Sequence, residues 1–155
     1  SERLAVRPTS EAIMYDSYSS PFVLSESGLR YDSTLGFAEV IGFRNSYCLP
    51  FYLYDIKNNR STNIVEIPLH VMDVSFSEKY MGITQEEALV KAYDLVREIE
   101  KFNGCFTLLW HNTYFSEYKY TGWKEVYCKI LEHCSGKDAL MTSGRNIYSL
   151  FTSKG

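Results

Sequence analysis

The residue best placed to do chemistry is His111, which directly follows a short apolar run over residues 105–110. An apolar run of this length between helical patterns predicts a strand that is buried on both faces of a parallel sheet. In such sheets, ligands and functional side chains gather beyond the carboxyl ends of the strands. Because imidazole exchanges a proton near neutral pH, His111 is a candidate general acid. The structural alternative is a polar strand end that is hydrogen-bonded to a neighbouring loop.

Asp73 ends an earlier apolar run, residues 64–72, much as His111 ends the later one. If both runs are parallel strands, their carboxyl ends lie at the same edge of the sheet. We therefore expect His111 to lie in an open, solvent-reachable position beside Asp73. The alternative for Asp73 is a purely local role, in which its carboxylate caps the turn that follows at residues 74–75.

Three further residues are candidates for binding a sugar. Trp110 and Tyr114 flank His111, and aromatic rings can stack against the C–H faces of sugars. Arg44 can pair with a carboxylate in a cleft or donate hydrogen bonds to sugar hydroxyls. The alternatives are a core position for Trp110 and a surface position for Arg44, because aromatic side chains dominate protein cores.

Composition argues for one globular domain and against several kinds of partner. The chain has 155 residues and a formal net charge of −3, which argues against a nucleic-acid-binding surface. No apolar window approaches the ~20 residues that cross a bilayer, and no secretory leader opens the sequence. We therefore expect a cytoplasmic location by default. The four cysteines form no C-x-x-C pair, so they are expected to be free thiols.

Hydrophobic periodicity predicts an alternation of strands and helices. A capping box opens the first clear helix, with Thr84 at the cap and Glu87 three residues later. The resulting order, strand–helix–strand–helix–strand–helix, predicts an α/β fold with a parallel sheet and right-handed crossovers. A long section over residues 33–63 shows little regular pattern. Helices are expected at 84–101, 123–134 and 143–151, and strands at 29–31, 64–73, 105–111 and 139–141.

Several phrases, in order, resemble the C-terminal half of the polysaccharide deacetylases, the NodB-homology carbohydrate esterases. The resemblance covers residues 21–151 and is fairly specific because five phrases occur in the family's order. These are Gly28-Leu29-Arg30-Tyr31-Asp32-Ser33-Thr34-Leu35-Gly36-Phe37, Ile41-Gly42-Phe43-Arg44, Ile67-Pro68-Leu69-His70-Val71-Met72-Asp73, Leu108-Leu109-Trp110-His111-Asn112 and Thr142-Ser143-Gly144-Arg145-Asn146-Ile147.

The resemblance implies part of a distorted (β/α) barrel that removes acetyl groups from N-acetylated bacterial glycans. It implies a divalent metal, zinc or cobalt, as cofactor. His111 matches the histidine that acts as general acid in that family and protonates the departing amine. Asp73 is the nearest match to the family's orienting carboxylate, and Asp32 is the other candidate.

The sequence also departs from the family in a way that affects activity. In the family, an Asp-Asp pair supplies the catalytic base and one metal ligand, and two histidines spaced four residues apart supply two further ligands. Neither motif occurs in this sequence. No metal ligand is therefore assigned in this chain. We expect residues 21–155 to be a C-terminal portion that is inactive alone, with metal and base supplied by a missing N-terminal portion. Because half a barrel exposes sheet edges, we also expect it to pair with a partner such as a second copy. The alternative is a non-catalytic module that binds a glycan or a protein.

Residues 4–16 carry a separate and shorter resemblance, to a segment of the prolyl-tRNA synthetases. In that segment a Thr and a Glu hold the amino acid, and Thr9 and Glu11 match them. No other synthetase motif follows, so a synthetase fragment is a remote alternative. Residues 1–20 are accordingly treated as an N-terminal segment whose origin the sequence leaves open.

Overall fold

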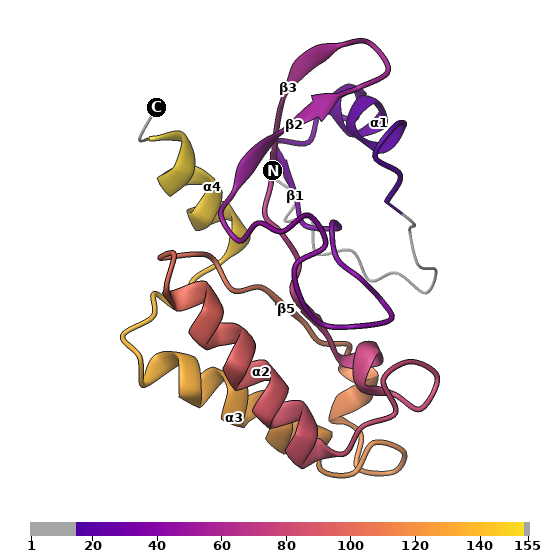
Figure 1. Cartoon of the computed structure of the whole chain (residues 1–155), viewed down its shortest axis with the longest axis vertical. Helices are drawn as coiled ribbons and strands as arrows, with labels where there is room; N and C mark the ends of the chain where they lie inside the picture. The colour runs from indigo at the N-terminus through magenta and orange to yellow at the C-terminus, as the bar shows by residue number, and fades with distance from the viewer. Residues whose placement is uncertain (1–14, 154–155) are drawn as a thin grey trace.

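The protein folds into two lobes that share one cleft (Figure 1). The computed structural model describes residues 15–153. The sheet lobe contains α1 (Ser20–Glu26), β1 (Tyr31–Asp32), β2 (Phe51–Asp55), β3 (Arg60–Glu66) and α4 (Gly144–Thr152). The helical lobe contains β4 (Val71–Met72), η1 (Asp73–Phe76), α2 (Gln85–Glu100), β5 (Leu108–Leu109), η2 (Asn112–Phe115) and α3 (Trp123–Ser135).

The sheet lobe is built on a three-stranded sheet in the order β1-β3-β2. The parallel pairing of β1 with β3 sets Asp32 directly opposite Glu66. The antiparallel pairing of β2 with β3 forms a hairpin with an irregularity between Tyr52 and Tyr54. α4 packs beside this sheet, where Tyr148 stacks on Tyr31 with ring centroids 5.8 Å apart.

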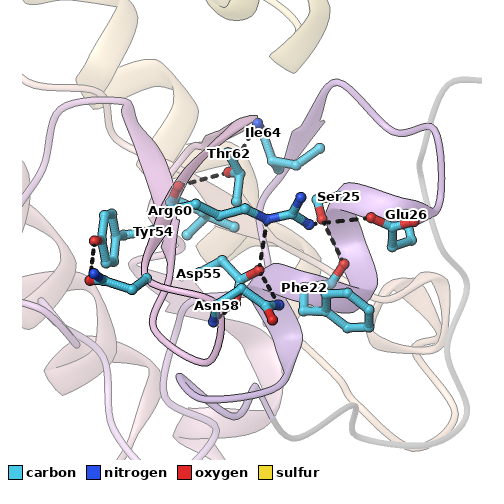
Figure 2. Close-up of polar contacts among 11 residues, drawn as sticks. Phe22, Ser25, Glu26, Tyr54, Asp55, Asn58, Arg60, Thr62 and Ile64 are labelled. Atoms are coloured by element: carbon cyan, nitrogen blue, oxygen red, sulfur yellow. Dashed lines mark hydrogen bonds and ion pairs between the residues drawn. The ribbon is translucent and has the colours of Figure 1, made fainter.

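The hairpin corrects the expectation of an irregular section over residues 33–63. Its strands were missed because their inward positions include polar residues, which breaks the apolar alternation that identifies strands. Asp55 is fully buried and accepts hydrogen bonds from the backbone and side chain of Asn58 and from Arg60 (Figure 2). Arg60 also pairs with Glu26 at 3.3 Å, which ties the hairpin to α1.

The helical lobe begins with a two-stranded parallel sheet, β4 paired with β5. The backbone N–H groups of His70 and Val71 both donate to the carbonyl of Thr107. The predicted strand over 64–73 divides into the end of β3, residues 64–66, and the two residues of β4. The predicted strand over 105–111 contains the two residues of β5, and its other residues lie outside regular strands. The predicted strand over 139–141 is wrong, because these residues are irregular and exposed.

The helices follow the sequence patterns closely. Thr84 and Glu87 form the predicted capping box at the start of α2, and Ser143 caps α4 through its hydroxyl. α2 and α3 lie side by side (Figure 1) and enclose the larger core. The buried members of that core are Cys48, Val71, Phe76, Ala88, Ala92, Leu95, Ile99, Val126 and Ile130.

The observed architecture is a mixed α/β fold with parallel pairings in both sheets. The barrel that the family resemblance implies stays an expectation. Cys48, Cys105, Cys128 and Cys134 are free thiols. Across residues 15–153, none of the helices combines the length and apolar character that a membrane span requires.

Candidate functional site

A cleft of about 1890 Å³ lies against both lobes and gathers the polar residues of interest. Its walls come from β1 and the following loop, from the carboxyl end of β5, from η2 and from the segment that enters α4. The lining residues that matter for chemistry are Asp32, Thr34, Arg44, His111, Tyr114 and Tyr120.

His111 and Asp73 form a hydrogen-bonded pair at the ends of β5 and β4. Because these strands are parallel and adjacent, the residues that follow them lie side by side. The ring Nδ1 of His111 lies 2.6 Å from Oδ1 of Asp73, and its backbone N–H donates to the other carboxylate oxygen. The Asp73 side chain is 0 % exposed, whereas that of His111 is 31 % exposed and lines the cleft.

The surroundings of Asp73 fix how the imidazole is presented. Its carboxylate also accepts the backbone N–H of Val74 at 2.7 Å, so it caps the turn as well as holding His111. Because a carboxylate only accepts hydrogen bonds, the proton between the two side chains belongs to Nδ1 of His111. The second ring nitrogen, Nε2, is then left to accept or to donate a proton, according to the charge of the ring.

Tyr114 lies behind this pair and is mostly part of the core. Its side chain is 5 % exposed and stacks on Tyr120, with ring centroids 4.0 Å apart. Burial, followed by the negative charge of Asp73, raises the pKa of Tyr114 to about 12. The phenol therefore stays protonated at neutral pH. Tyr114 and Tyr120 both line the cleft and give it an aromatic wall.

Trp110 packs in the core, which is the alternative to sugar binding expected for this residue from the sequence. It packs against Phe76, Tyr114, Trp123 and Tyr127, and its indole N–H is buried without a partner. Within residues 15–153, the cleft lining includes both neighbours of Trp110 in sequence but not Trp110 itself. Its ring consequently supports the wall on which Tyr114 lies.

Arg44 holds two loops together in the lining of the cleft. Its guanidinium donates to the carbonyls of Gly36 at 2.9 Å and Tyr15 at 2.8 Å. It also lies over the rings of Tyr15 and Phe37, 5.6 and 5.8 Å from their centroids. Two of its donors are thus occupied by backbone, and the side chain contributes to the cleft as part of its wall.

Glu66 is the chemically unusual residue that the sequence patterns did not single out. It is fully buried, accepts the backbone N–H of Leu35 at 3.0 Å through Oε1, and has no partner at Oε2. Burial and the adjacent charge of Asp32 raise its pKa to about 8. The available signal was a lone carboxyl group inside the apolar run Ile64-Val65-Glu66-Ile67.

Comparison with protein-family models, with curated proteins and with solved structures finds no significant match. The site is therefore interpreted from its own geometry. His111 and Asp73 are brought together, Arg44 and Tyr114 line the same cleft, and Trp110 lies behind it. Thr9 and Glu11, which carry the synthetase resemblance, lie outside the described residues.

The residues that the structure describes do not fit the metal site that the family resemblance implies. A catalytic zinc site needs about three protein ligands and an open position. Among the described residues, no group of three or more His, Cys, Asp and Glu side chains lies close enough together to hold a metal ion. His70 is buried against Phe43 and Phe106, and His133 stacks on Tyr93, so the two other histidines are engaged elsewhere.

Proposed function

We propose that this chain is the proton-donating portion of a carbohydrate N-deacetylase of the polysaccharide-deacetylase type, acting on N-acetylated bacterial glycans. The observation that supports this proposal best is the His111–Asp73 pair, with a fully buried carboxylate and a partly exposed imidazole in the cleft. A sealed imidazole, or one that pointed away from any concavity, would have argued against it.

The pair is suited to protonating a leaving group. Hydrolysis of an acetamido group breaks a C–N bond, and the amine departs readily only when its nitrogen receives a proton. A protonated His111 can donate that proton from Nε2, because Nδ1 is held by Asp73. Asp73 keeps the ring oriented and stabilises its positive charge, as a buried carboxylate does in other Asp–His pairs. His111 is then the catalytic acid and Asp73 the positioning residue.

We propose that the rest of the reaction is carried out by groups outside the described residues. Because the described residues do not gather a metal-binding set, no step of the reaction is assigned to a metal held by them. The resemblance places the metal ligands and the catalytic base on a missing N-terminal portion. We propose that such a portion completes the site at the cleft.

The second candidate function is glycan binding without hydrolysis. The aromatic wall favours it, since a sugar ring can stack on the partly exposed ring of Tyr120, against which the buried ring of Tyr114 packs. Under this hypothesis the His111–Asp73 pair donates hydrogen bonds to the ligand and performs no proton transfer.

The first experiment is an NMR titration of the chain with a short N-acetylated glucosamine oligomer. We expect shifts of the ring resonances of His111 and of its neighbours, whereas those of His133, which stacks on Tyr93, stay unchanged. The absence of any shift at His111 at millimolar oligomer would contradict both candidate functions.

The second experiment separates the two functions through acetate release, measured with added Zn²⁺ or Co²⁺ on this chain supplied with the portion proposed to complete the site, because the chain is expected to be inactive alone. Release that falls about a hundredfold or more in His111→Ala supports the deacetylase, because positioned general acids contribute roughly 10²–10⁴-fold. His133→Ala is the matched control and should retain the wild-type rate. Binding at His111 without any release supports the glycan-binding module, and release that His111→Ala leaves unchanged removes His111 from the mechanism.

A further inference from the structure

A second pair of ionisable residues lies in the wall of the cleft, at the carboxyl ends of β1 and β3. Asp32 and Glu66 are direct partners in the parallel register, so their side chains lie on the same face of the sheet. Neighbouring strands are only about 4.8 Å apart, which brings the two carboxyl groups close together. Asp32 lines the cleft, and Glu66 lies behind it with no exposed surface.

The pair has too few hydrogen-bond donors for two negative charges. Oε1 of Glu66 accepts from the backbone N–H of Leu35, and Oδ2 of Asp32 accepts from the hydroxyl of Thr34. Oε2 of Glu66 is fully buried and has no hydrogen-bond partner. A buried charge without donors is costly, and two adjacent carboxylates repel, so such pairs commonly retain one proton.

The other charged and titratable groups around Glu66 do not outweigh the effects of burial and of Asp32, which favour its protonated form. Arg44 attracts the ionised form of Glu66, but its guanidinium is engaged with the carbonyls of Gly36 and Tyr15. The phenol of Tyr15 has a pKa raised to about 12 by burial and by the charges of Glu66 and Asp32, so it stays neutral. Burial and Asp32 consequently dominate, and they keep Glu66 protonated at neutral pH.

We infer that Asp32 and Glu66 act as a unit that holds one proton in the wall of the cleft, on Glu66, and presents the Asp32 carboxylate to a bound ligand. Asp32 is then a hydrogen-bond acceptor for a hydroxyl or amino group of a sugar. The cleft thus contains a donor, His111, and an acceptor, Asp32, on different strands. The choice of a sugar as ligand rests on the proposed function, whereas the shared proton does not.

The shared proton is tested by a pH titration of the side-chain carboxyl ¹³C resonances by NMR. We expect Glu66 to titrate near pH 8. Asp32→Asn should lower the titration midpoint of Glu66 by about one pH unit or more. Glu39→Gln is the matched control, because Glu39 is an exposed carboxyl residue of the same cleft, and should leave that midpoint unchanged.

Two results would overturn the inference. One is a wild-type Glu66 that titrates near its ordinary pH of about 4.5. The other is a raised midpoint that Asp32→Asn does not move, which would assign the whole effect to burial. If Asp32→Asn does not fold, Asp32→Ser, which also removes the charge, takes its place in the same titration of Glu66.

The ligand is tested separately with the same N-acetylated oligomer. We expect Asp32→Asn to weaken binding about tenfold, and Glu39→Gln to leave it unchanged. Wild-type binding that is equal in Asp32→Asn overturns the acceptor role of Asp32. No binding by any form of the protein, together with the expected titration of Glu66, contradicts the glycan-directed function and supports the shared proton.

Discussion

The two lobes bury carboxyl groups in opposite ways. In the helical lobe, Asp73 is fully buried yet accepts from the ring and backbone of His111 and from the backbone of Val74. In the sheet lobe, Glu66 is equally buried, accepts from Leu35, and faces a second carboxyl group. The pKa of Glu66 rises to about 8 as a result. Burial alone therefore does not decide whether a carboxyl group is charged, because the number of donors around it also matters.

The hydrophobic cores of the two lobes also differ, in their size. The helical lobe has a large cluster between α2, α3 and the β4–β5 pair, whereas that of the sheet lobe consists of Tyr15, Leu35, Leu53 and Ile64. Among the described residues, the lobe with the larger core holds the His111–Asp73 pair, and the lobe with the smaller core holds the Asp32–Glu66 pair. The predictions below test this contrast, from the largest expected effect to the smallest.

Ile130→Ala tests the core of the helical lobe. Ile130 is fully buried between α2 and α3, so its truncation leaves a cavity that rigid neighbours cannot fill. We expect a loss toward the upper end of about 2–5 kcal/mol in the free energy of unfolding, measured by urea denaturation. Leu53→Ala, in the smaller cluster, should fall near the lower end of that range. A larger loss for Leu53→Ala would reverse the contrast between the lobes.

Glu66→Gln tests the pH dependence of the sheet lobe. The folded-state pKa of Glu66 is raised to about 8, so its stabilising contribution is complete below its ordinary pKa of 4.5 and is lost as the pH rises to 8. Between these limits the wild-type free energy of unfolding should fall by about 1.4 kcal/mol per pH unit relative to Glu66→Gln. Urea denaturation from pH 4.5 to 8 measures the difference. Parallel curves for the two proteins would contradict the raised pKa, and Glu39→Gln should behave like wild type.

His70→Gln tests the opposite pH dependence at the junction of the lobes. Burial lowers the folded-state pKa of His70 to about 4, from an ordinary value of 6.5. The stability that the neutral ring contributes is therefore present above pH 6.5 and is lost as the pH falls toward 4, by about 1.4 kcal/mol per unit. Denaturation curves across that interval should be flatter for His70→Gln than for His133→Gln. An equal slope in both variants would show that His70 does not titrate with folding.

Thr84→Ala tests a local contact of the helical lobe. The Thr84 hydroxyl accepts from the backbone of Glu87 in a capping box at the start of α2. Its loss should lower the free energy of unfolding by about 1 kcal/mol. Ser143→Ala removes the corresponding cap of α4, a helix with no buried residue, and should cost less. A larger loss for Ser143→Ala would mean that α4 supports the fold more than its exposure indicates.

Sequence patterns predicted the helices better than the strands, for a physical reason. The capping residues Thr84 and Ser143 act within one turn, so their signals are local and appear in the printed sequence. Strands β1, β4 and β5 each pair over two residues, which is too short for a periodicity to develop. The β2–β3 hairpin was missed because Asp55 and Thr62 point inward and depend on specific hydrogen bonds for their burial.

The candidate site was predictable in part. His111 and Asp73 were recognisable because each ends an apolar run, and parallel pairing then brings those ends together. Glu66 was not recognisable as functional, because its protonation depends on Asp32, thirty-four positions earlier, being its partner across the sheet. Trp110 and Tyr114 are both aromatic residues near His111 in the sequence. Only the packing of η2 against α3 shows that Tyr114 is among the residues that line the cleft and that Trp110 is not.

The aromatic cluster of the helical lobe has a spectroscopic consequence. The chain has two tryptophans, Trp110 and Trp123, and both pack against Phe76 in this lobe. Fluorescence excited beyond the absorption of tyrosine therefore reports on the helical lobe alone, within a few ångströms of the residues that hold His111. Near-ultraviolet circular dichroism of the tyrosines has contributions from both lobes, including the sheet lobe. Comparing the unfolding transitions seen by the two signals therefore reveals whether the lobes unfold as one cooperative unit or in succession.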